Sequence, residues 1–167
     1  MNIWIMRHGE AEPTAPTDVQ RALTEEGRKM SFEQGKWIGE QLINQGVKLD
    51  KIIVSPYTRT RQTYKQVVAG MQAVNFVQSF ANSQESGIVS YWDKVTPDSS
   101  TYNIYLHLDM LRGLGKKNVL IISHLPLVLD LTHELLEQSV FVPFYPATAI
   151  CIEWFGEDGK IIAGRTP

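Results

Sequence analysis

Three short, mostly apolar runs, spread widely along the chain, most constrain how this 167-residue sequence can fold. They read NIWIM, KIIVS and NVLIIS, and their length suits a strand better than a helix. Continuous rather than alternating apolar runs are typical of strands that are buried on both faces. The runs at residues 2–6, 51–55 and 118–123 therefore predict the centre of a parallel sheet that is covered by helices.

Helix signals fall between these strands. Thr24 can cap a helix whose first turn carries two glutamates, and that helix extends to about Asn44, with Gly46 as its stop. Residues 82–100 look mostly irregular, and Asp98 is favoured as a cap for the helix that follows. Further helices are predicted at 58–71, 101–115 and 126–137, and a short strand at 73–77.

Two late strands complete the predicted fold. Residues 148–155 and 160–165 read as strands joined by Glu157-Asp158-Gly159, a hairpin signal that adds an antiparallel element. The fold class is therefore α/β, with one domain over residues 1–167, a mostly parallel central sheet and helices on both faces. The single cysteine, Cys151, lies in the first late strand and is expected to be a small buried hydrophobe.

Composition excludes several function classes. The net charge of −2 and the lack of a basic run give no support to nucleic-acid binding. No apolar run approaches the roughly 18 residues that span a bilayer, and the N-terminal run is too short for a signal peptide. The histidines His107 and His133 lack metal-ligand spacing and are expected to be partly exposed helix residues. We expect a cytoplasmic monomer that needs no metal or cofactor and binds neither nucleic acid nor membrane.

Polar residues follow each of the three apolar runs. Arg7-His8-Gly9 follows the first, Ser55 and then Arg59 and Arg61 follow the second, and Ser123-His124 ends the third. Because ligands of open α/β sheets bind outside the carboxyl ends of the strands, these side chains are expected to meet at one edge. Arginine forks and nearby helix N-termini suit a phosphoryl group.

His8 is the candidate nucleophile at this edge. Arginines around it should disfavour its protonated form, which leaves the imidazole neutral near pH 7. Gly9 lets the backbone approach closely, and a nearby carbonyl could hold one ring N–H so that the other nitrogen attacks.

Four ordered blocks resemble the histidine phosphatase superfamily, the phosphoglycerate-mutase-like group with an Arg-His-Gly motif. IMRHGEA, RALTEEG, VSPYTRTRQT and ISHLPLV are similar, in content, order and spacing, to those of the small bacterial SixA-type phosphohistidine phosphatases. The resemblance covers about residues 2–155. It implies the fold of that superfamily and hydrolysis of a phosphohistidine on a signalling (phosphorelay) protein domain.

The resemblance also implies roles for single residues. His8 matches the nucleophile that takes the phosphoryl group, and Gly9 and Arg21 are candidate substrate-binding residues, the latter near the mouth of the site. Arg61 lies on another face of its helix and is expected at the surface. The catalytic set that would also bind phosphate is Arg7, Arg59 and His124 with His8.

An expected acid is missing from the pattern. Larger members of the superfamily carry an acidic proton donor and a helical insertion over the site, whereas only 64 residues lie between Arg59 and His124. Lys94 stands where an acid is expected, and Asp93 and Asp98 are nearby without a secure alignment. A serine alkoxide needs a proton from an acid when it leaves, and a protonated imidazole does not. The missing acid therefore favours phosphohistidine over a phosphate ester, while phosphoaspartate also has a good leaving group and is set aside only by the resemblance.

Two alternatives stay open at this point. One is a small-molecule phosphatase or mutase on the same scaffold, although a mutase needs an enclosed site for which the chain looks too short. The other is a module that binds phosphorylated protein without turnover. Such a module would lack the nucleophile or the second histidine, and both are present here.

Overall fold

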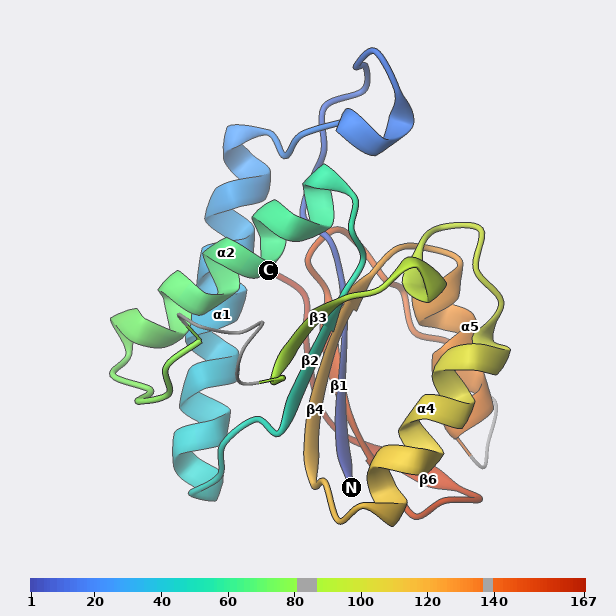
Figure 1. Cartoon of the computed structure of the whole chain (residues 1–167). Helices are drawn as coiled ribbons and strands as arrows, with labels where there is room; N and C mark the ends of the chain where they lie inside the picture. The colour runs from blue at the N-terminus through green and yellow to red at the C-terminus, as the bar shows by residue number, and fades with distance from the viewer. Residues whose placement is uncertain (81–86, 137–139) are drawn as a thin grey trace.

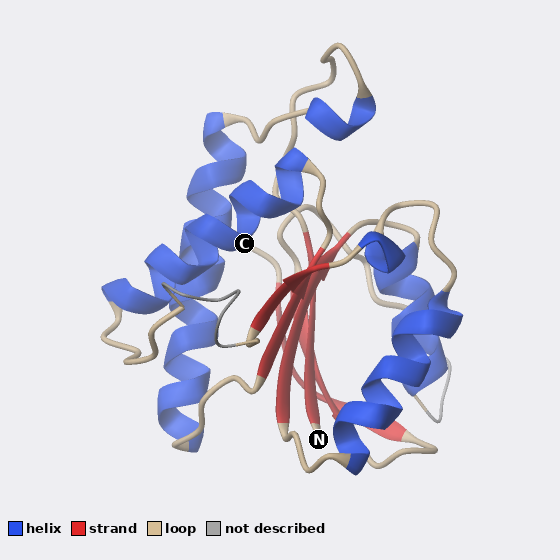
Figure 2. Ribbon diagram, viewed as in Figure 1, coloured by secondary structure: helices blue, strands red, loops and turns tan. Residues whose placement is uncertain are grey.

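One six-stranded sheet organises the protein, as seen in a computed structural model that describes residues 1–80, 87–136 and 140–167. The strands lie in the order β3-β2-β4-β1-β5-β6. Their bounds are β1 Asn2–Arg7, β2 Lys51–Val54, β3 Val89–Tyr91, β4 Asn118–Ser123, β5 Ala149–Trp154 and β6 Gly159–Arg165. Helices cover both faces of this sheet, with α1 and α2 on one side and α4 and α5 on the other (Figures 1 and 2). The fold class predicted from the sequence is confirmed.

The helices begin and end close to the predicted residues. The Thr24 side chain accepts a hydrogen bond from the Gly27 amide at the start of α1, and Gly46 ends that helix with a φ of 66°. Two short 3₁₀ helices, η1 Asp18–Gln20 and η2 Asp93–Val95, lie in connecting segments. The helix bounds are α1 Glu25–Gln45, α2 Thr58–Ala73, α4 Thr101–Gly113 and α5 Leu127–Leu135.

The three apolar runs form the centre of the sheet and run parallel. β4 pairs with β1 on one side and with β2 on the other, both in parallel register. β1 also pairs with β5, which is antiparallel to it, and β6 extends the sheet as the predicted hairpin. The carboxyl ends of β1, β2 and β4 therefore meet at one edge of the sheet.

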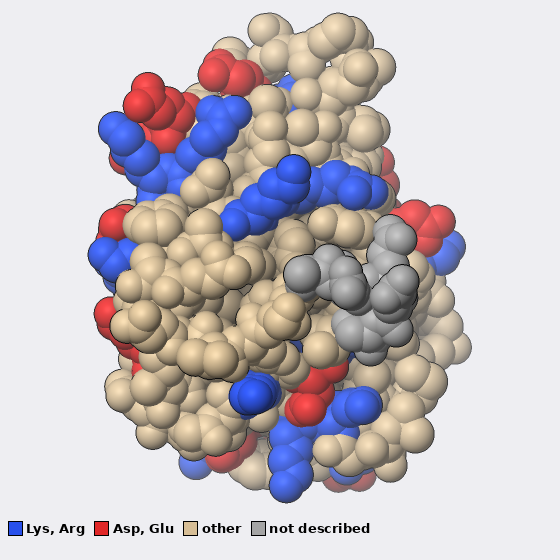
Figure 3. Space-filling view, turned by 60° about the vertical axis from the view of Figure 1, so that its left-hand side comes forward, with Lys and Arg blue, Asp and Glu red and all other residues tan. Residues whose placement is uncertain are grey.

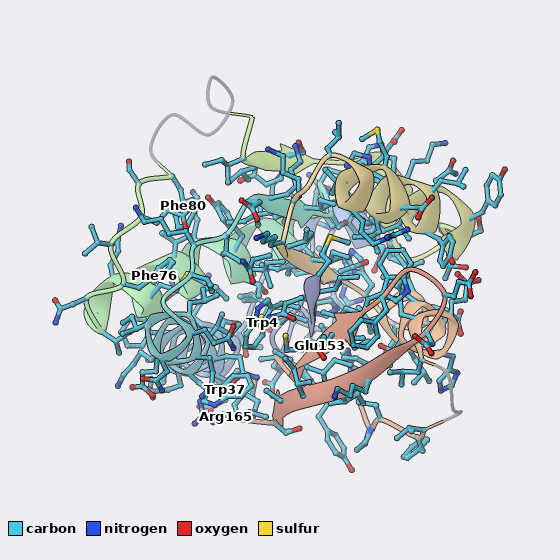
Figure 4. All side chains as sticks on the ribbon, turned by 90° about the horizontal axis from the view of Figure 1, so that it is seen from below. Trp4, Trp37, Phe76, Phe80, Glu153 and Arg165 are labelled. Carbon is cyan, nitrogen blue, oxygen red and sulfur yellow. The ribbon has the colours of Figure 1, made fainter. Side chains whose placement is uncertain are left out.

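Alternate residues of the central strands supply two separate cores. Ile3 and Ile5 on β1 face α4 and α5, whereas Trp4 and Met6 face α1 and α2. The Trp4 ring meets Trp37 of α1 edge-on, with centroids 5.7 Å apart (Figure 4). Because both faces of each central strand are buried, these strands need an apolar residue at nearly every position.

Helices α1 and α2 cross with their backbones in close contact. A Cβ added at Gly35 of α1 would lie 2.3 Å from the Val67 carbonyl oxygen, and one added at Gly70 of α2 would lie 2.2 Å from the Phe32 carbonyl oxygen. Such distances leave no room for a side chain at either position. The two helices therefore touch through glycine, at a spacing set by their main chains.

Two predictions for the loops and helix ends are wrong. Residues 73–77 form no strand, because α2 continues to Ala73 and Asn75 turns the chain with a φ of 64°. Asp98 does not cap α4, since Ser100 is the residue at that position and no side-chain cap bond forms. The described part of residues 82–100 is mostly irregular, as predicted, and holds only β3 and η2 as short elements. Residues 81–86 and 137–139, where parts of two predictions fall, lie outside the described residues.

The remaining surface and core features agree with the composition. Cys151 is buried in β5, and burial raises the pKa of its thiol to about 12. No helix in the described ranges combines the length and the hydropathy that a bilayer crossing requires. Basic and acidic side chains are interspersed over the side that Figure 3 turns forward.

Candidate active site

The carboxyl edge of the central strands gathers the predicted side chains. Arg7 pairs with Ser123 in the β1–β4 register, so the next residues, His8 and His124, lie side by side. Their ring centroids are 5.1 Å apart. Arg59 joins them from the first turn of α2, where its guanidinium and the His124 ring both contact Tyr57 at 5.0 Å. We call Arg7, His8, Arg59 and His124 the strand-end cluster.

His8 is held in one tautomer by the backbone. Its Nδ1 lies 2.7 Å from the Gly9 carbonyl oxygen, and since a carbonyl only accepts, Nδ1 donates and carries the proton. The main-chain amide of His8 donates to the Ser123 carbonyl oxygen at 3.0 Å, which fixes the residue to β4. The other ring nitrogen, Nε2, therefore carries a free lone pair when the ring is neutral.

Burial keeps the His8 ring neutral. Its side chain is 8% exposed, and desolvation is the largest cause that lowers its pKa from 6.5 to about 4. The hydrogen bond to Gly9 opposes this shift, and the charges of Arg59, Arg7 and Arg21 add to it. The arginines named in the sequence analysis therefore contribute to the neutral state of the ring, but burial is its leading cause.

His124 is almost completely buried beside His8. Its Nε2 lies 2.7 Å from the Ser55 hydroxyl, and its buried Nδ1 has no partner among the described residues. Desolvation is again the largest cause that lowers its pKa, here to about 2, followed by the charges of His8 and Arg59. His124 can therefore act at neutral pH only as a neutral hydrogen-bonding group.

Each of the two arginines of the cluster is held by hydrogen bonds from its terminal nitrogens, and its Nε remains unpaired among the described residues. Arg7 donates from NH1 to the Phe144 carbonyl oxygen at 2.8 Å. Arg59, 4% exposed, donates from NH1 to the Asp18 carbonyl oxygen and from NH2 to the Asp18 carboxylate. The Nε atoms of both arginines are buried without a partner in the described part of the chain. With His124 Nδ1, they supply polar atoms for an anion at this edge.

Arg21 lies at the rim of the cluster, on the segment that carries η1. Its Nε donates to the Glu12 carbonyl oxygen at 2.8 Å, and its NH1 donates to the Asp18 carboxylate at 2.9 Å. These bonds point the guanidinium toward the same carboxylate that Arg59 holds. Its charge also acts on His8, as the predicted place near the mouth requires.

Gly9 allows three elements to meet next to His8. A Cβ at this position would lie 2.5 Å from the Ser31 hydroxyl oxygen and 2.6 Å from the Gly27 carbonyl oxygen of α1. The Gly9 amide donates to the Thr63 hydroxyl of α2 at 3.1 Å, and that hydroxyl donates to the Arg59 carbonyl oxygen. The predicted close backbone approach is confirmed, and it joins the strand tip to the helix that bears Arg59.

Arg61 stays outside the cluster, as predicted. It is exposed, donates from Nε to the Pro56 carbonyl oxygen, and stacks on the Tyr91 ring at 3.9 Å. Arg59 is therefore the arginine of this block that faces His8 and His124.

The other residues singled out from the sequence lie at the surface or in α4 and α5. Asp93, Lys94 and Asp98 are exposed. Since a proton donor must reach the reacting group, their exposure gives no support to a catalytic acid here. His107 is half-buried against Trp92, and His133 is exposed on α5.

Metal-binding geometry is not found in the described ranges. No three His, Cys, Asp or Glu side chains of residues 1–80, 87–136 and 140–167 come together as a metal would require. Positive charge at the strand-end cluster comes from its arginines instead.

Three further contacts build the site, and two of the residues that make them, Thr63 and Asp18, were not singled out from the sequence. Ser55 holds His124, Thr63 links Gly9 to α2, and Asp18 bridges Arg59 and Arg21. Ser55 and Thr63 stand inside the block VSPYTRTRQT, so their positions were visible but not their partners. Asp18 gave no signal, because its contact with Arg59 joins segments 41 residues apart.

Comparison with known proteins places the chain in a family. A profile of the histidine phosphatase superfamily (branch 1) matches residues 3–79. The chain is 39% identical to the phosphohistidine phosphatase SixA homolog of Haemophilus influenzae over 97% of its own length and 93% of that protein. It is 31% identical to phosphohistidine phosphatase SixA of Escherichia coli, over 96% of this chain and 89% of that one.

A solved structure agrees with these relatives. The structure of the protein histidine phosphatase SixA complexed with tungstate matches with a TM-score of 0.80 and 28% identity, over 98% of this chain and 96% of that chain. The similarity extends over nearly the full length of both chains, so it is not confined to one short motif. This chain belongs to the histidine phosphatase superfamily, as a SixA-like member.

Proposed function

We propose that this protein is a phosphohistidine phosphatase that removes a phosphoryl group from a histidine of a signalling (phosphorelay) protein. The observation that carries the proposal is the His8 ring, which is neutral, proton-bearing at Nδ1 and free to attack through Nε2. An imidazole in this state next to fixed cations suits nucleophilic catalysis of phosphoryl transfer. The SixA relatives are named for this activity.

The first step is attack of His8 Nε2 on phosphorus. A bond forms between Nε2 and phosphorus while the substrate's P–N bond breaks, and its electron pair returns to the substrate imidazole. When that imidazole carries a proton on its other nitrogen, it leaves as a neutral ring. No acid of this protein is then needed at this step, in keeping with the exposure of Asp93 and Asp98.

Water completes the reaction in the second step. It attacks the phosphoryl group on His8, the Nε2–P bond breaks, and inorganic phosphate and free His8 result. Arg7, Arg59 and His124 are proposed to hold the phosphoryl oxygens in both steps, through the donors described above. Tungstate, which the solved SixA structure contains, is a tetrahedral oxyanion of the same general shape as phosphate.

Gly9 and Arg21 are proposed to support this chemistry from either side. Gly9 supplies the carbonyl that fixes the His8 tautomer, and Arg21 adds positive charge at the rim. A phosphorylated side chain of another protein would approach from that rim. We further propose a monomer of the cytoplasm without nucleic-acid or membrane partners, in keeping with a net charge of −2. Light scattering tests the monomer.

The test compares three substrates on one enzyme. The specificity constant kcat/KM is measured on a phosphohistidine, a phosphoaspartate and a phosphoserine protein, with p-nitrophenyl phosphate as a small-molecule reference. Phosphohistidine should be turned over fastest, and rapid quench should trap an acid-labile, alkali-stable phosphoenzyme that His8→Ala lacks. Normal turnover by His8→Ala would remove the nucleophile from the proposal, and equal rates on phosphoserine would mean that an acid is at work.

A further inference from the structure

Asp18 places an anion on the strand-end cluster from within the chain. Its backbone carbonyl accepts from Arg59 NH1 at 2.7 Å, and its carboxylate accepts from Arg59 NH2 at 3.1 Å. The same carboxylate accepts from Arg21 NH1 at 2.9 Å. One carboxylate thus bridges the two guanidinium groups that the phosphoryl chemistry would use.

The carboxylate of Asp18 is charged at neutral pH and acts on the cluster. The hydrogen bond from Arg21 is the largest cause that lowers its pKa, and the hydrogen bond from Arg59 acts in the same direction. The negative charge of Asp18 also raises the pKa of His124, against the larger effect of burial. Asp18 therefore lies within the electrostatic reach of the second histidine as well as of the arginines.

The segment that carries Asp18 lies outside the core. Residues 12–20 are all exposed, and η1 has no buried residue. In Figure 1 this segment extends beyond the carboxyl edge of the sheet, past the ends of α1 and α2. Among the described residues, the Asp18 carboxylate contacts Arg59 and Arg21, and its main-chain carbonyl accepts from Arg59, so withdrawal of the segment would break these contacts and leave the core intact.

We propose that Asp18 is an internal competitor for the phosphoryl site, which it occupies between turnovers, leaves when the phosphoryl group binds, and retakes as inorganic phosphate departs. This inference rests on the proposed function, because it takes the strand-end cluster as the phosphoryl site. Arg59 is a buried cation, and a buried cation without a partner is costly. Exchange of one anion for another keeps it paired throughout the cycle.

The exchange would also let the site distinguish anions. Arg7 Nε, Arg59 Nε and His124 Nδ1 are buried and have no partner among the described residues, and in this proposal a phosphoryl group bonds to them once Asp18 has left. A carboxylate from solution offers the same two oxygens as Asp18, so it makes no additional bonds to the arginines and has no advantage over the tethered Asp18 side chain. Phosphate oxygens can therefore displace Asp18, whereas ordinary carboxylates cannot. The returning carboxylate then shortens the residence time of inorganic phosphate and limits inhibition by product.

Calorimetric titration with inorganic phosphate tests this inference independently of turnover. If Asp18 covers the arginines about nine tenths of the time, its removal should tighten phosphate binding about tenfold. Asp18→Ala removes the competitor, and Asp18→Asn keeps an acceptor of the same size without the charge. Both should lower the dissociation constant of phosphate, the alanine variant by more.

The chain offers a matched control on another surface. Asp109 pairs with Arg112 at 3.3 Å and its side chain is 53% exposed, against 55% for Asp18. Asp109→Ala should leave phosphate binding unchanged. Phosphate should also speed hydrogen exchange at the Gln20 and Arg21 amides of the wild-type protein, which donate to the Thr17 and Asp18 carbonyls.

The outcomes separate this inference from the proposed function. Unchanged or weaker phosphate binding in both Asp18 variants would overturn the inference, because Asp18 would then be inert or would position Arg59 for the ligand. Slower exchange at Gln20 and Arg21 with phosphate would overturn it as well, since Asp18 would close over the anion. A wild-type protein that binds no phosphate at all would overturn the proposed function together with the inference.

Discussion

Arg59→Ala should reduce kcat/KM on a phosphohistidine protein about 10²- to 10³-fold, while the protein stays folded. Arg59 offers the cluster a buried guanidinium whose Nε has no partner among the described residues. Loss of one preorganised donor to a developing anion typically costs that factor in rate. It corresponds to about 2.7–4 kcal/mol of transition-state stabilisation.

The folded state should tolerate the same change. The partner that Arg59 leaves behind is Asp18, whose side chain is 55% exposed and keeps its bond to Arg21. Water can therefore solvate the carboxylate, so the large penalty of an orphaned buried charge does not arise. Thermal unfolding should shift by only a few degrees, and the loss of activity can be assigned to the missing guanidinium.

Arg61→Ala is the matched control, two residues along the same helix. It removes an exposed side chain that bonds to Pro56 and stacks on Tyr91, so kcat/KM should change by less than about threefold. Steady-state kinetics of both variants and the wild-type protein, with circular dichroism to verify folding, measure the contrast. Comparable losses in both variants would show that the wrong arginine has been assigned to the phosphoryl site.

The other expectations concern stability, packing and metal independence. The free energy of unfolding should fall as the pH is lowered from about 6.5 toward 4, by about 1.4 kcal/mol per pH unit for each of His8 and His124. The cause is that the histidines of the unfolded chain bind protons in this pH range, whereas the buried rings of the folded protein do not. Urea titrations at several pH values measure this slope, and a flat profile would contradict the buried neutral rings. Gly9→Ala should abolish most activity and destabilise the fold by about 1–3 kcal/mol, since its Cβ would collide with the α1 backbone, and a variant with wild-type kinetics would show that the contact can relax. Activity should survive EDTA, and restoration of a lost activity by a divalent ion would refute this.

Local sequence patterns were sufficient for the central strands and most helices. NIWIM and NVLIIS are apolar at almost every position because both faces of β1 and β4 are buried, and this demand is visible in sequence. β3 has three residues at the edge of the sheet and leaves no comparable run. The apolar residues of the failed strand at 73–77 belong to the end of α2 and to the turn at Asn75, whose φ is 64°.

The candidate site was predictable to the extent that strand ends determine it. Arg7, His8 and His124 follow parallel strands, so their meeting at one edge is a consequence of the sheet. Contacts between distant segments could not be predicted in the same way. The bond of Ser55 to His124 still joins two strand ends, because β2 pairs with β4, whereas the bond of Asp18 to Arg59 depends on a loop path that no periodicity encodes.

The glycine contact between α1 and α2 has a consequence for how such proteins diverge. Where helices pack through large side chains, each substitution in the interface shifts their separation. Here Gly35 and Gly70 bring main chain against main chain, so the separation does not depend on which apolar residues surround it. Beyond this contact, the Thr63 hydroxyl ties the Gly9 amide, next to His8, to the Arg59 main-chain carbonyl. Substitutions elsewhere in the core should therefore leave the distance between His8 and Arg59 largely unaffected.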